Sequence, residues 1–332
     1  MSAPATDGAG TTSPVADVAG HVYGPVPSRR LGRSLGVDLV PMKSCPYDCV
    51  YCQLGPTRSL TVRRQTFAPV AGIVEELGRA LARAPAPAAI TLAGSGEPTL
   101  YRPLGELITA IKRITAIPVV LLTNGALFCD AGVRREAALA DRVLPSLDAG
   151  DERFFRYVNR PHDTLTLEKV VAGLEAFRAE YERPIWLEVM VVAHQTDRGL
   201  RLQRIADQAR RIQPDRIQLN TPVRPARLGR SAIVARERLD RLCALFTPTA
   251  EVIADFKTAP TSESEEGGAL QQRLLELLAR RPCTLDESAT GLAVAPHAVA
   301  KALTALRAAG LVRQRRRGKQ SYFVATQGRM RQ

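Results

Sequence analysis

The sequence predicts an α/β protein, namely a partial (β/α)6 TIM-like barrel followed by a small C-terminal domain. Two observations lead to this fold class. Six apolar, often β-branched runs alternate with helical patterns between residues 35 and 220, and a segment rich in Pro, Ser, Glu and Gly, residues 258–268, precedes an Arg-rich end. The 332 residues are 45% hydrophobic and contain no apolar run of about 18 residues, so we expect a large core and no membrane association.

The apolar runs that we assign to strands are Leu35–Val40, Ala89–Ala93, Pro118–Thr123, Arg142–Leu147, Ile185–Val192 and Arg216–Asn220. The segments between them carry apolar residues at helical spacing, as at Ile73, Leu77 and Leu81. Strands that are apolar on both faces suit a parallel sheet covered by helices, whose crossovers are right-handed. A seventh short run, Glu251–Phe256, is expected to add a strand at one edge.

Three cysteines with the spacing C-x3-C-x2-C, Cys45, Cys49 and Cys52, are the strongest chemical signal in the chain. Three thiolates can hold three irons of a [4Fe-4S] cluster and leave the fourth iron open. Zinc is the alternative, but a zinc site usually has four ligands and no second Cys or His pair follows. Residues 1–20 lack the features of a secretory signal, which disfavours disulfides and predicts a cytoplasmic protein.

The cysteine run, with Tyr51 before its last thiol, resembles the C-x3-C-x-aromatic-C signature of the radical S-adenosylmethionine (SAM) superfamily. The resemblance implies two cofactors, a [4Fe-4S] cluster and SAM, whose methionyl amine and carboxylate chelate the open iron. It also implies that Tyr51 lies near the adenine, and that a flavodoxin- or ferredoxin-like protein donates one electron.

The residues that follow the second strand, Gly94-Ser-Gly-Glu-Pro98, resemble the Gly-Gly-Glu-Pro motif of the same superfamily, with Ser95 in place of the second glycine. In a parallel barrel this end of a strand faces the reaction site. Gly94 and Gly96 would let the backbone approach SAM, and Glu97 would accept a hydrogen bond from its ammonium group. The alternative is an ordinary Gly-rich turn before a helix.

Polar residues also follow the third and fourth strands, at Asn124, Ser146 and Asp148. The resemblance implies that these residues contact the ribose hydroxyls and the methionine carboxylate of SAM. Taken one at a time, each could equally be a polar residue that closes a turn.

Three further segments, residues 23–32, 158–162 and 219–225, resemble a radical SAM subfamily related to the wybutosine-synthesis enzyme, which acts on tRNA. The resemblance implies RNA or tRNA as a possible substrate. The candidate substrate contacts in these segments are Arg29, Arg30, His162, Asn220 and Arg224. Arg224 could instead be a surface residue in an Arg-rich chain.

The domain boundaries that we predict are a disordered leader at 1–20, the radical SAM partial barrel at 21–257, a linker at 258–268, a winged-helix domain at 269–326 and a tail at 327–332. The C-terminal domain should contain helices over Leu270–Arg281 and Pro296–Ala309, and between them a helix that opens with the capping box Thr284-Leu-Asp-Glu287. A hairpin over Leu311–Val324, with a basic turn at Gly318, completes a resemblance to winged helix-turn-helix domains.

Residues 269–332 contain 12 Lys and Arg against 3 Asp and Glu, a net charge of +9. This charge suggests contact with RNA or DNA phosphates. The third helix offers His297 and Lys301 but no Asn, Gln or Arg on its opening turn, which favours nonspecific binding. A packing or protein-docking module with a solvated basic hairpin is the alternative.

Two functions remain for the whole chain. The first is a radical SAM enzyme that cleaves SAM reductively and abstracts hydrogen from a substrate. The second is a nucleic-acid-binding regulator whose iron–sulfur cluster acts as a sensor. A sensor does not need SAM-binding residues at the strand tips, so residues 94–97 and 146–148 favour the enzyme.

Overall fold

The computed structural model describes residues 20–28, 30–83, 85–222, 232–254, 267–292, 294, 296–317 and 320–326. Arg29 and Arg224 lie outside these ranges, as do most of the expected leader and linker, the turn at Gly318 and the tail. Within these ranges, no helix combines the length and apolar character needed to cross a lipid bilayer.

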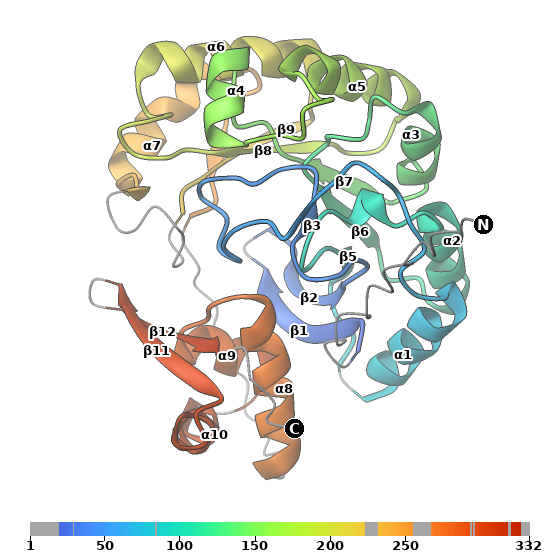
Figure 1. The fold of residues 1–332 in the computed structure, drawn as a ribbon, viewed down its shortest axis with the longest axis vertical. Coiled ribbons are helices and arrows are strands. Elements are labelled where there is room, and N and C mark those ends of the chain that lie inside the picture. The colour runs from blue at the N-terminus through green and yellow to red at the C-terminus, as the bar shows by residue number, and fades with distance from the viewer. Residues whose placement is uncertain are drawn as a thin grey trace, which may run out of the picture.

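The parallel sheet that the sequence predicts is present, and it forms the centre of the larger domain. Strands β2 (Gly32–Val37), β5 (Ala89–Leu92), β6 (Val119–Thr123) and β7 (Arg142–Pro145) are adjacent and parallel. Single bridges from β7 connect them to β8 (Trp186–Met190), β9 (Arg216–Asn220) and the edge strand β10 (Glu251–Val252), which are also parallel. The six predicted strands and the seventh edge strand are thus confirmed, and they follow one another in an arc (Figure 1).

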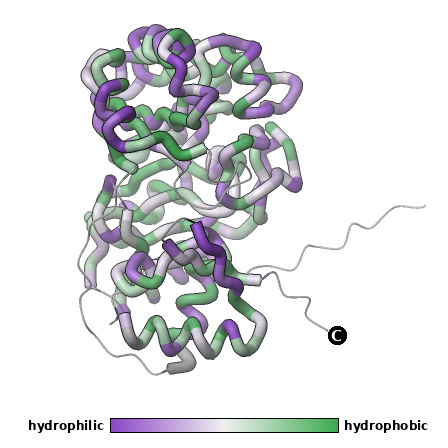
Figure 2. The backbone as a smooth tube through the Cα atoms, turned by 90° about the vertical axis from the view of Figure 1, so that its left-hand side faces the viewer, coloured by the Kyte–Doolittle hydropathy of each residue, from purple (hydrophilic) through white to green (hydrophobic). Residues whose placement is uncertain are grey.

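Helices lie along the outside of this arc (Figure 1). They are α1 (Val70–Arg83), α2 (Leu104–Ile114), α3 (Ala131–Ala137), α4 (Glu152–Val158), α5 (Leu167–Glu180), α6 (Gly199–Ile212) and α7 (Arg236–Leu242). Their apolar faces pack on the sheet, as the spacing of Ile73 and Leu77 predicts, and both of these side chains are fully buried. Green strands in the interior and purple segments on the outer helices show the same separation in Figure 2.

An antiparallel strand at the edge of the sheet, β1 (Val22–Ser28), was not predicted from the sequence. Pro25 and Pro27 argue against a strand because proline donates no hydrogen bond, but an edge strand tolerates them. Its partner β2 begins at Gly32, three residues before the predicted Leu35, because Arg33 and Ser34 pair with β1 despite their polarity.

The C-terminal domain contains α8 (Gly267–Arg280), α9 (Leu285–Leu292), α10 (Pro296–Ala308) and the hairpin β11 (Val312–Arg317) and β12 (Gln320–Ala325). The order of the predicted elements is confirmed, although α8 begins inside the expected linker. The capping box also forms, because Thr284 N donates to Glu287 Oε2 at 2.9 Å and Glu287 N donates to Thr284 Oγ1 at 3.1 Å.

The C-terminal domain packs directly on β1 through α8 and α9 (Figure 1). Val26 of β1 is part of the hydrophobic core that Leu274 of α8 and Leu303 of α10 form, and Tyr23 packs against the same core. The two domains therefore share buried surface beyond their covalent connection.

Candidate active site

The three cysteines of the predicted cluster motif lie beside two adjoining cavities at the carboxyl ends of the strands. Cys45 is in the short strand β3 (Ser44–Cys45), which pairs with β4 (Ser59–Leu60), and Cys49 and Cys52 are in the loop that follows. All three are free thiols and half-buried. Cys45 and Cys49 line a cavity of about 380 Å³, and Cys45 and Cys52 line its neighbour of about 350 Å³. We call them the first and the second cavity.

Each of the three sulfur atoms accepts a hydrogen bond from a nitrogen. Asn124 Nδ2 donates to Cys45 Sγ at 3.4 Å, and Asn159 Nδ2 donates to Cys49 Sγ at 3.5 Å. Lys43 Nζ lies 3.1 Å from Cys52 Sγ. Such donors stabilise negative charge on the sulfurs, and hydrogen bonds of this kind tune the potential of an iron–sulfur cluster.

The donor set fits a cluster better than a single metal ion. In the described part of the chain, no three His, Cys, Asp or Glu side chains come close enough together to bind one ion. A cubane is wider than an ion, and its thiolates bind three different irons. Burial raises the pKa of the Cys45 thiol to about 12 and that of Cys49 well above its usual value, so thiolates require the positive charge of bound iron.

Gly94 and Gly96, which follow β5, lie so close to other parts of the protein that a larger residue would clash at either position. A Cβ on Gly94, which has φ +155°, would lie 2.4 Å from the carboxyl carbon of Asp38. A Cβ on Gly96 would lie 2.1 Å from the carbonyl oxygen of Ser44. The loop thus packs tightly on the cysteine segment, and both glycines line both cavities.

Glu97 lines the first cavity and is 2% exposed. Its Oε1 accepts from Thr99 N at 3.1 Å, from Thr99 Oγ1 at 2.7 Å and from Thr123 Oγ1 at 2.6 Å, while Oε2 accepts from Asn124 N at 2.8 Å. Burial raises the pKa of this carboxyl, and these donors oppose the shift. Glu97 therefore connects the ends of β5 and β6 through hydrogen bonds, as we would also expect if residues 94–97 formed only a Gly-rich turn. Oε1 accepts three of these hydrogen bonds and Oε2 accepts one, so Oε2 is the oxygen better placed to accept a further hydrogen bond from a ligand.

Asp148 does not lie where a side chain that contacts SAM is expected. It lines neither cavity and is 3% exposed. Its carboxylate accepts hydrogen bonds from the Tyr51 hydroxyl, from Asn159 Nδ2 at 2.9 Å and from Met190 N at 3.0 Å. Burial raises the pKa of Asp148 to about 6. In this arrangement Asp148 anchors the cysteine loop through Tyr51, whose ring lines the second cavity.

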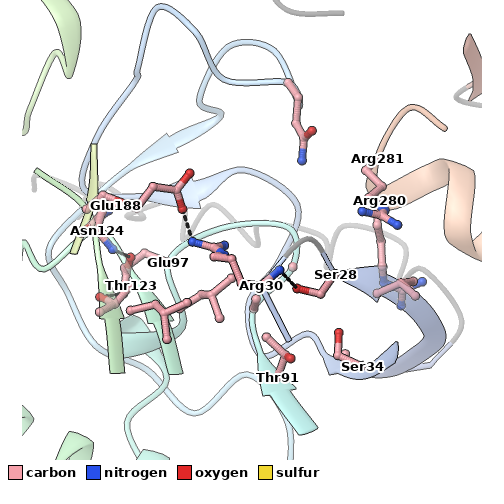
Figure 3. Close-up of a pocket in the computed structure, with 18 of the residues that line it drawn as sticks. Ser28, Arg30, Ser34, Thr91, Glu97, Thr123, Asn124, Glu188, Arg280 and Arg281 are labelled. Atoms are coloured by element: carbon pink, nitrogen blue, oxygen red, sulfur yellow. Dashed lines mark hydrogen bonds and ion pairs between the residues drawn. The ribbon is translucent and has the colours of Figure 1, made fainter. Parts of the chain in front are cut away.

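The remaining predicted residues divide into two groups. Asn124 and Ser146 line the first cavity, and Arg30 and Asn220 line both. Arg30 lies beside Glu188 (Figure 3), and Glu188 also accepts a hydrogen bond from Asn220 Nδ2. His162 lines neither cavity. Its ring Nδ1 lies 3.0 Å from Thr164 Oγ1, and its backbone N–H donates to Pro46 O at 2.8 Å. The position of His162 therefore does not support the prediction that it contacts a substrate. Its backbone hydrogen bond to Pro46 instead holds the cysteine loop.

Several site residues were missed in the sequence. Lys43 lies two residues before Cys45, and Asn159 lies in the segment 158–162, yet only the fold shows that both side chains reach sulfur atoms. Arg280 and Arg281 line the first cavity from the C-terminal domain. No local pattern could find these two, because their position depends on how the domains pack.

Comparison with known proteins agrees with this geometry. The family model of the Radical SAM superfamily matches residues 39–202. The chain belongs to this superfamily of enzymes, which use a [4Fe-4S] cluster and SAM.

Its relatives define the family more closely. A UPF0026 protein of Synechocystis sp. is 40% identical over 63% of this chain and 78% of its own length, so the chain is a member of the UPF0026 family. A protein of Brachyspira hyodysenteriae named GTPase Obg is 34% identical over 89% of this chain, which spans only 43% of that relative's length. A radical SAM methyltransferase from Sphaerobacter thermophilus aligns with a TM-score of 0.49 at 18% identity, over 66% of this chain and 65% of that one, a likeness too distant to bear on function.

Proposed function

We propose that this protein is a cytoplasmic radical SAM enzyme with a partial (β/α)6 barrel, which cleaves SAM reductively and abstracts hydrogen from a substrate. The observation that carries the proposal is the arrangement of three free thiols, each with a nitrogen donor, around cavities that the Gly94–Glu97 loop also lines. Cys45, Cys49 and Cys52 would hold the cluster. When bound and reduced, the cluster and SAM supply an electron and a carbon-centred radical for hydrogen abstraction.

The protein side chains position these groups. Lys43, Asn124 and Asn159 donate toward the sulfurs, and Glu97 holds Asn124 in place through its backbone N–H. The free acceptor position on Glu97 Oε2 suits the SAM ammonium. The ring of Tyr51, fixed by Asp148, offers a wall for the adenine in the second cavity. We expect a flavodoxin- or ferredoxin-like protein to supply the electron.

We further propose that the C-terminal domain is a winged helix and that it contacts RNA or DNA, with RNA or tRNA as the substrate. Support comes from the hairpin, where Arg313, Arg315 and Arg316 are exposed on β11, and from the exposed Lys301 on α10. These cations can neutralise phosphates without reading base edges. The family assignment does not favour the alternative of an iron–sulfur-sensing regulator.

The test of the proposed reaction is anaerobic reconstitution of the full chain with iron and sulfide. With dithionite as the reductant, the loaded protein should convert SAM to 5'-deoxyadenosine and methionine. A protein that carries a full cluster and binds SAM but never forms 5'-deoxyadenosine would contradict the proposal.

A further inference from the structure

The first cavity continues beyond the cysteines to the edge of the sheet. Its other end is lined by residues of β1, β2 and β5, and by Arg280 and Arg281 of the C-terminal domain. None of the residues that we assign to the cluster lies at this end. The end thus offers room next to the cofactors, bounded by both domains (Figure 3).

Hydroxyl groups line this end of the cavity. Ser28 of β1, Ser34 of β2 and Thr91 of β5 all line it, and Figure 3 shows them on neighbouring strands. Thr91 is 6% exposed, and its Oγ1 has no hydrogen-bond partner in the described part of the chain. A buried hydroxyl without a partner is destabilising, so such a group in a cavity wall indicates a ligand or a water as its partner.

Cations lie above these hydroxyls. Arg30 forms an ion pair with Glu188, whose Oε1 also accepts from Asn220 Nδ2 at 2.7 Å. The pair uses the Nη1 group of Arg30, whereas a guanidinium has five N–H donors arranged to bind an oxyanion in a bidentate manner. Arg281 approaches the cavity from the opposite side (Figure 3).

The ion pair of Arg30 and Glu188 also stands between the two cavities, since both residues line each of them. The second cavity is lined by Tyr51, to which we assign the adenine of SAM, and by the cluster ligand Cys52. The other proposed SAM contacts, such as Glu97 and Asn124, line the first cavity together with Cys45. A group bound to Arg30 at the end formed by β1, β2 and β5 would therefore lie next to SAM.

We propose that this end of the first cavity is the substrate site, and that it binds an oxyanion substituent, phosphate or carboxylate, of a hydroxyl-bearing molecule. Arg30 and Arg281 bind the oxyanion from the two domains, and Ser34 and Thr91 bind the hydroxyl groups. This inference rests on the proposed function, because it takes Tyr51 in the second cavity and Glu97 in the first as SAM contacts, and leaves only the end at β1, β2 and β5 for the substrate. Phosphate and carboxylate share the chemistry that Arg recognises, so the experiment separates them.

The experiment is calorimetric titration of the cluster-loaded full chain, at fixed ionic strength, with inorganic pyrophosphate in one arm and citrate in the other. We expect saturable binding at one site in at least one arm, and the tighter arm identifies the anion. Arg30→Gln should weaken that binding at least tenfold. Thr91→Val, which removes a hydroxyl without changing charge, should weaken it about threefold. The control is Arg113→Gln, which removes an exposed charge from the last turn of α2 that lines neither cavity.

Arg30→Gln leaves Glu188 without its cation, so thermal unfolding must show that the variant is folded; Thr91→Val tests the same site independently. No saturable binding to the loaded wild type, or equal weakening by all three substitutions, would overturn the inference. Iron content and 5'-deoxyadenosine formation, measured on the same samples, report on the proposed function separately. Absence of anion binding with these two intact refutes only the substrate site.

Discussion

The Arg280 guanidinium of the C-terminal domain lies over the Asp38 carboxylate at the end of β2, with 3.6 Å between Nε and Oδ2. The two side chains are 3% and 10% exposed. Asp38 also accepts a hydrogen bond from Ser95 N at 3.0 Å, within the Gly94–Glu97 loop. The C-terminal domain is thereby connected to the loop that we assign to SAM, through one buried ion pair.

This connection predicts that Arg280→Ala lowers both stability and SAM affinity. Burial already raises the pKa of Asp38, and removal of its cation would leave a buried charge uncompensated. Breaking a buried pair by removing one partner typically costs about 3–5 kcal/mol. We expect a destabilisation near the lower end of this range, because the distance between the two charged groups is longer than a hydrogen bond. We also expect weaker SAM binding, because Arg280 no longer holds in place the Asp38 carboxylate that accepts from Ser95. Chemical denaturation and SAM titration of the loaded protein measure the two effects.

Arg113→Ala is the matched control, since it removes an exposed arginine from α2. Asp38→Asn combined with Arg280→Met should restore part of the stability, because neither residue then leaves an isolated charge. Equal stability of wild type and Arg280→Ala would show that the ion pair contributes nothing to the packing of the domains.

Replacing any one of Cys45, Cys49 and Cys52 by Ala should abolish cluster binding. Each thiol is the ligand of one iron in the proposed site, and no fourth protein thiol lies in this motif to replace it. Wild type should bind about four irons, with an electron paramagnetic spectrum that changes on addition of SAM. Cys129→Ala, which removes an exposed free cysteine outside the motif, is the control. Stoichiometric zinc without iron after anaerobic expression would contradict the cluster.

The sequence predicted the parts of the fold that depend on local pattern. Apolar runs such as Ala89–Ala93 indicate the parallel strands, because a strand that is buried on both faces needs apolar side chains on both. Thr284 and Glu287 indicate the start of a helix, because residues at this spacing can form the two hydrogen bonds of a capping box. Strand β1 was missed because its prolines are unfavourable in most strands and acceptable only at an edge, and an edge is a property of the whole sheet.

The sequence predicted which strand ends contribute residues to the site, but it did not predict the direction of every side chain. Glu97 reaches the first cavity as expected, whereas Asp148 accepts a hydrogen bond from Tyr51 of the cysteine loop and lines neither cavity. Sequence position fixes the end of the strand, but neighbouring donors decide the direction of the side chain. Arg280 and Asp38 are far apart in the chain, and only the packing of α8 on β1 brings them together.

Glu97→Gln should weaken SAM binding by about 1.5–3 kcal/mol while the cluster still forms. The substitution removes the charge that would bind the SAM ammonium, and it turns one acceptor oxygen into a donor that faces the N–H and O–H groups around it. SAM titration by calorimetry on protein of known iron content measures the effect.

A control separates direct contact from support of the loop. Thr99→Val removes the hydroxyl that donates to Glu97 Oε1 but keeps the carboxylate charge. We expect it to reduce SAM affinity much less than Glu97→Gln does. If Glu97→Gln retains full SAM affinity in loaded protein, residues 94–97 act only as a turn.

The basic hairpin should bind nucleic acid through charge alone. Arg313, Arg315 and Arg316 are exposed on β11, and the groove beside it is lined by Thr304 and Arg307 of α10. Changing the three hairpin arginines to Gln in the full chain should weaken RNA binding and reduce the slope of log affinity against log salt, by up to about one unit for each phosphate that the protein no longer neutralises. The full chain is needed because Val26 of β1 completes the core of the C-terminal domain.

The matched control for the hairpin variant removes three exposed arginines elsewhere, Arg79, Arg83 and Arg113 on α1 and α2, and so makes the same change in net charge. Fluorescence anisotropy with labelled tRNA and with single-stranded DNA of unrelated sequence, at several salt concentrations, measures both variants. Because α10 offers few side chains that read bases, affinities for the two nucleic acids should differ little once length is matched. If the hairpin and control variants lose affinity equally, binding follows net charge rather than the hairpin. If wild type binds neither nucleic acid at about 50 mM salt, the domain is a docking module and an RNA substrate loses its main support.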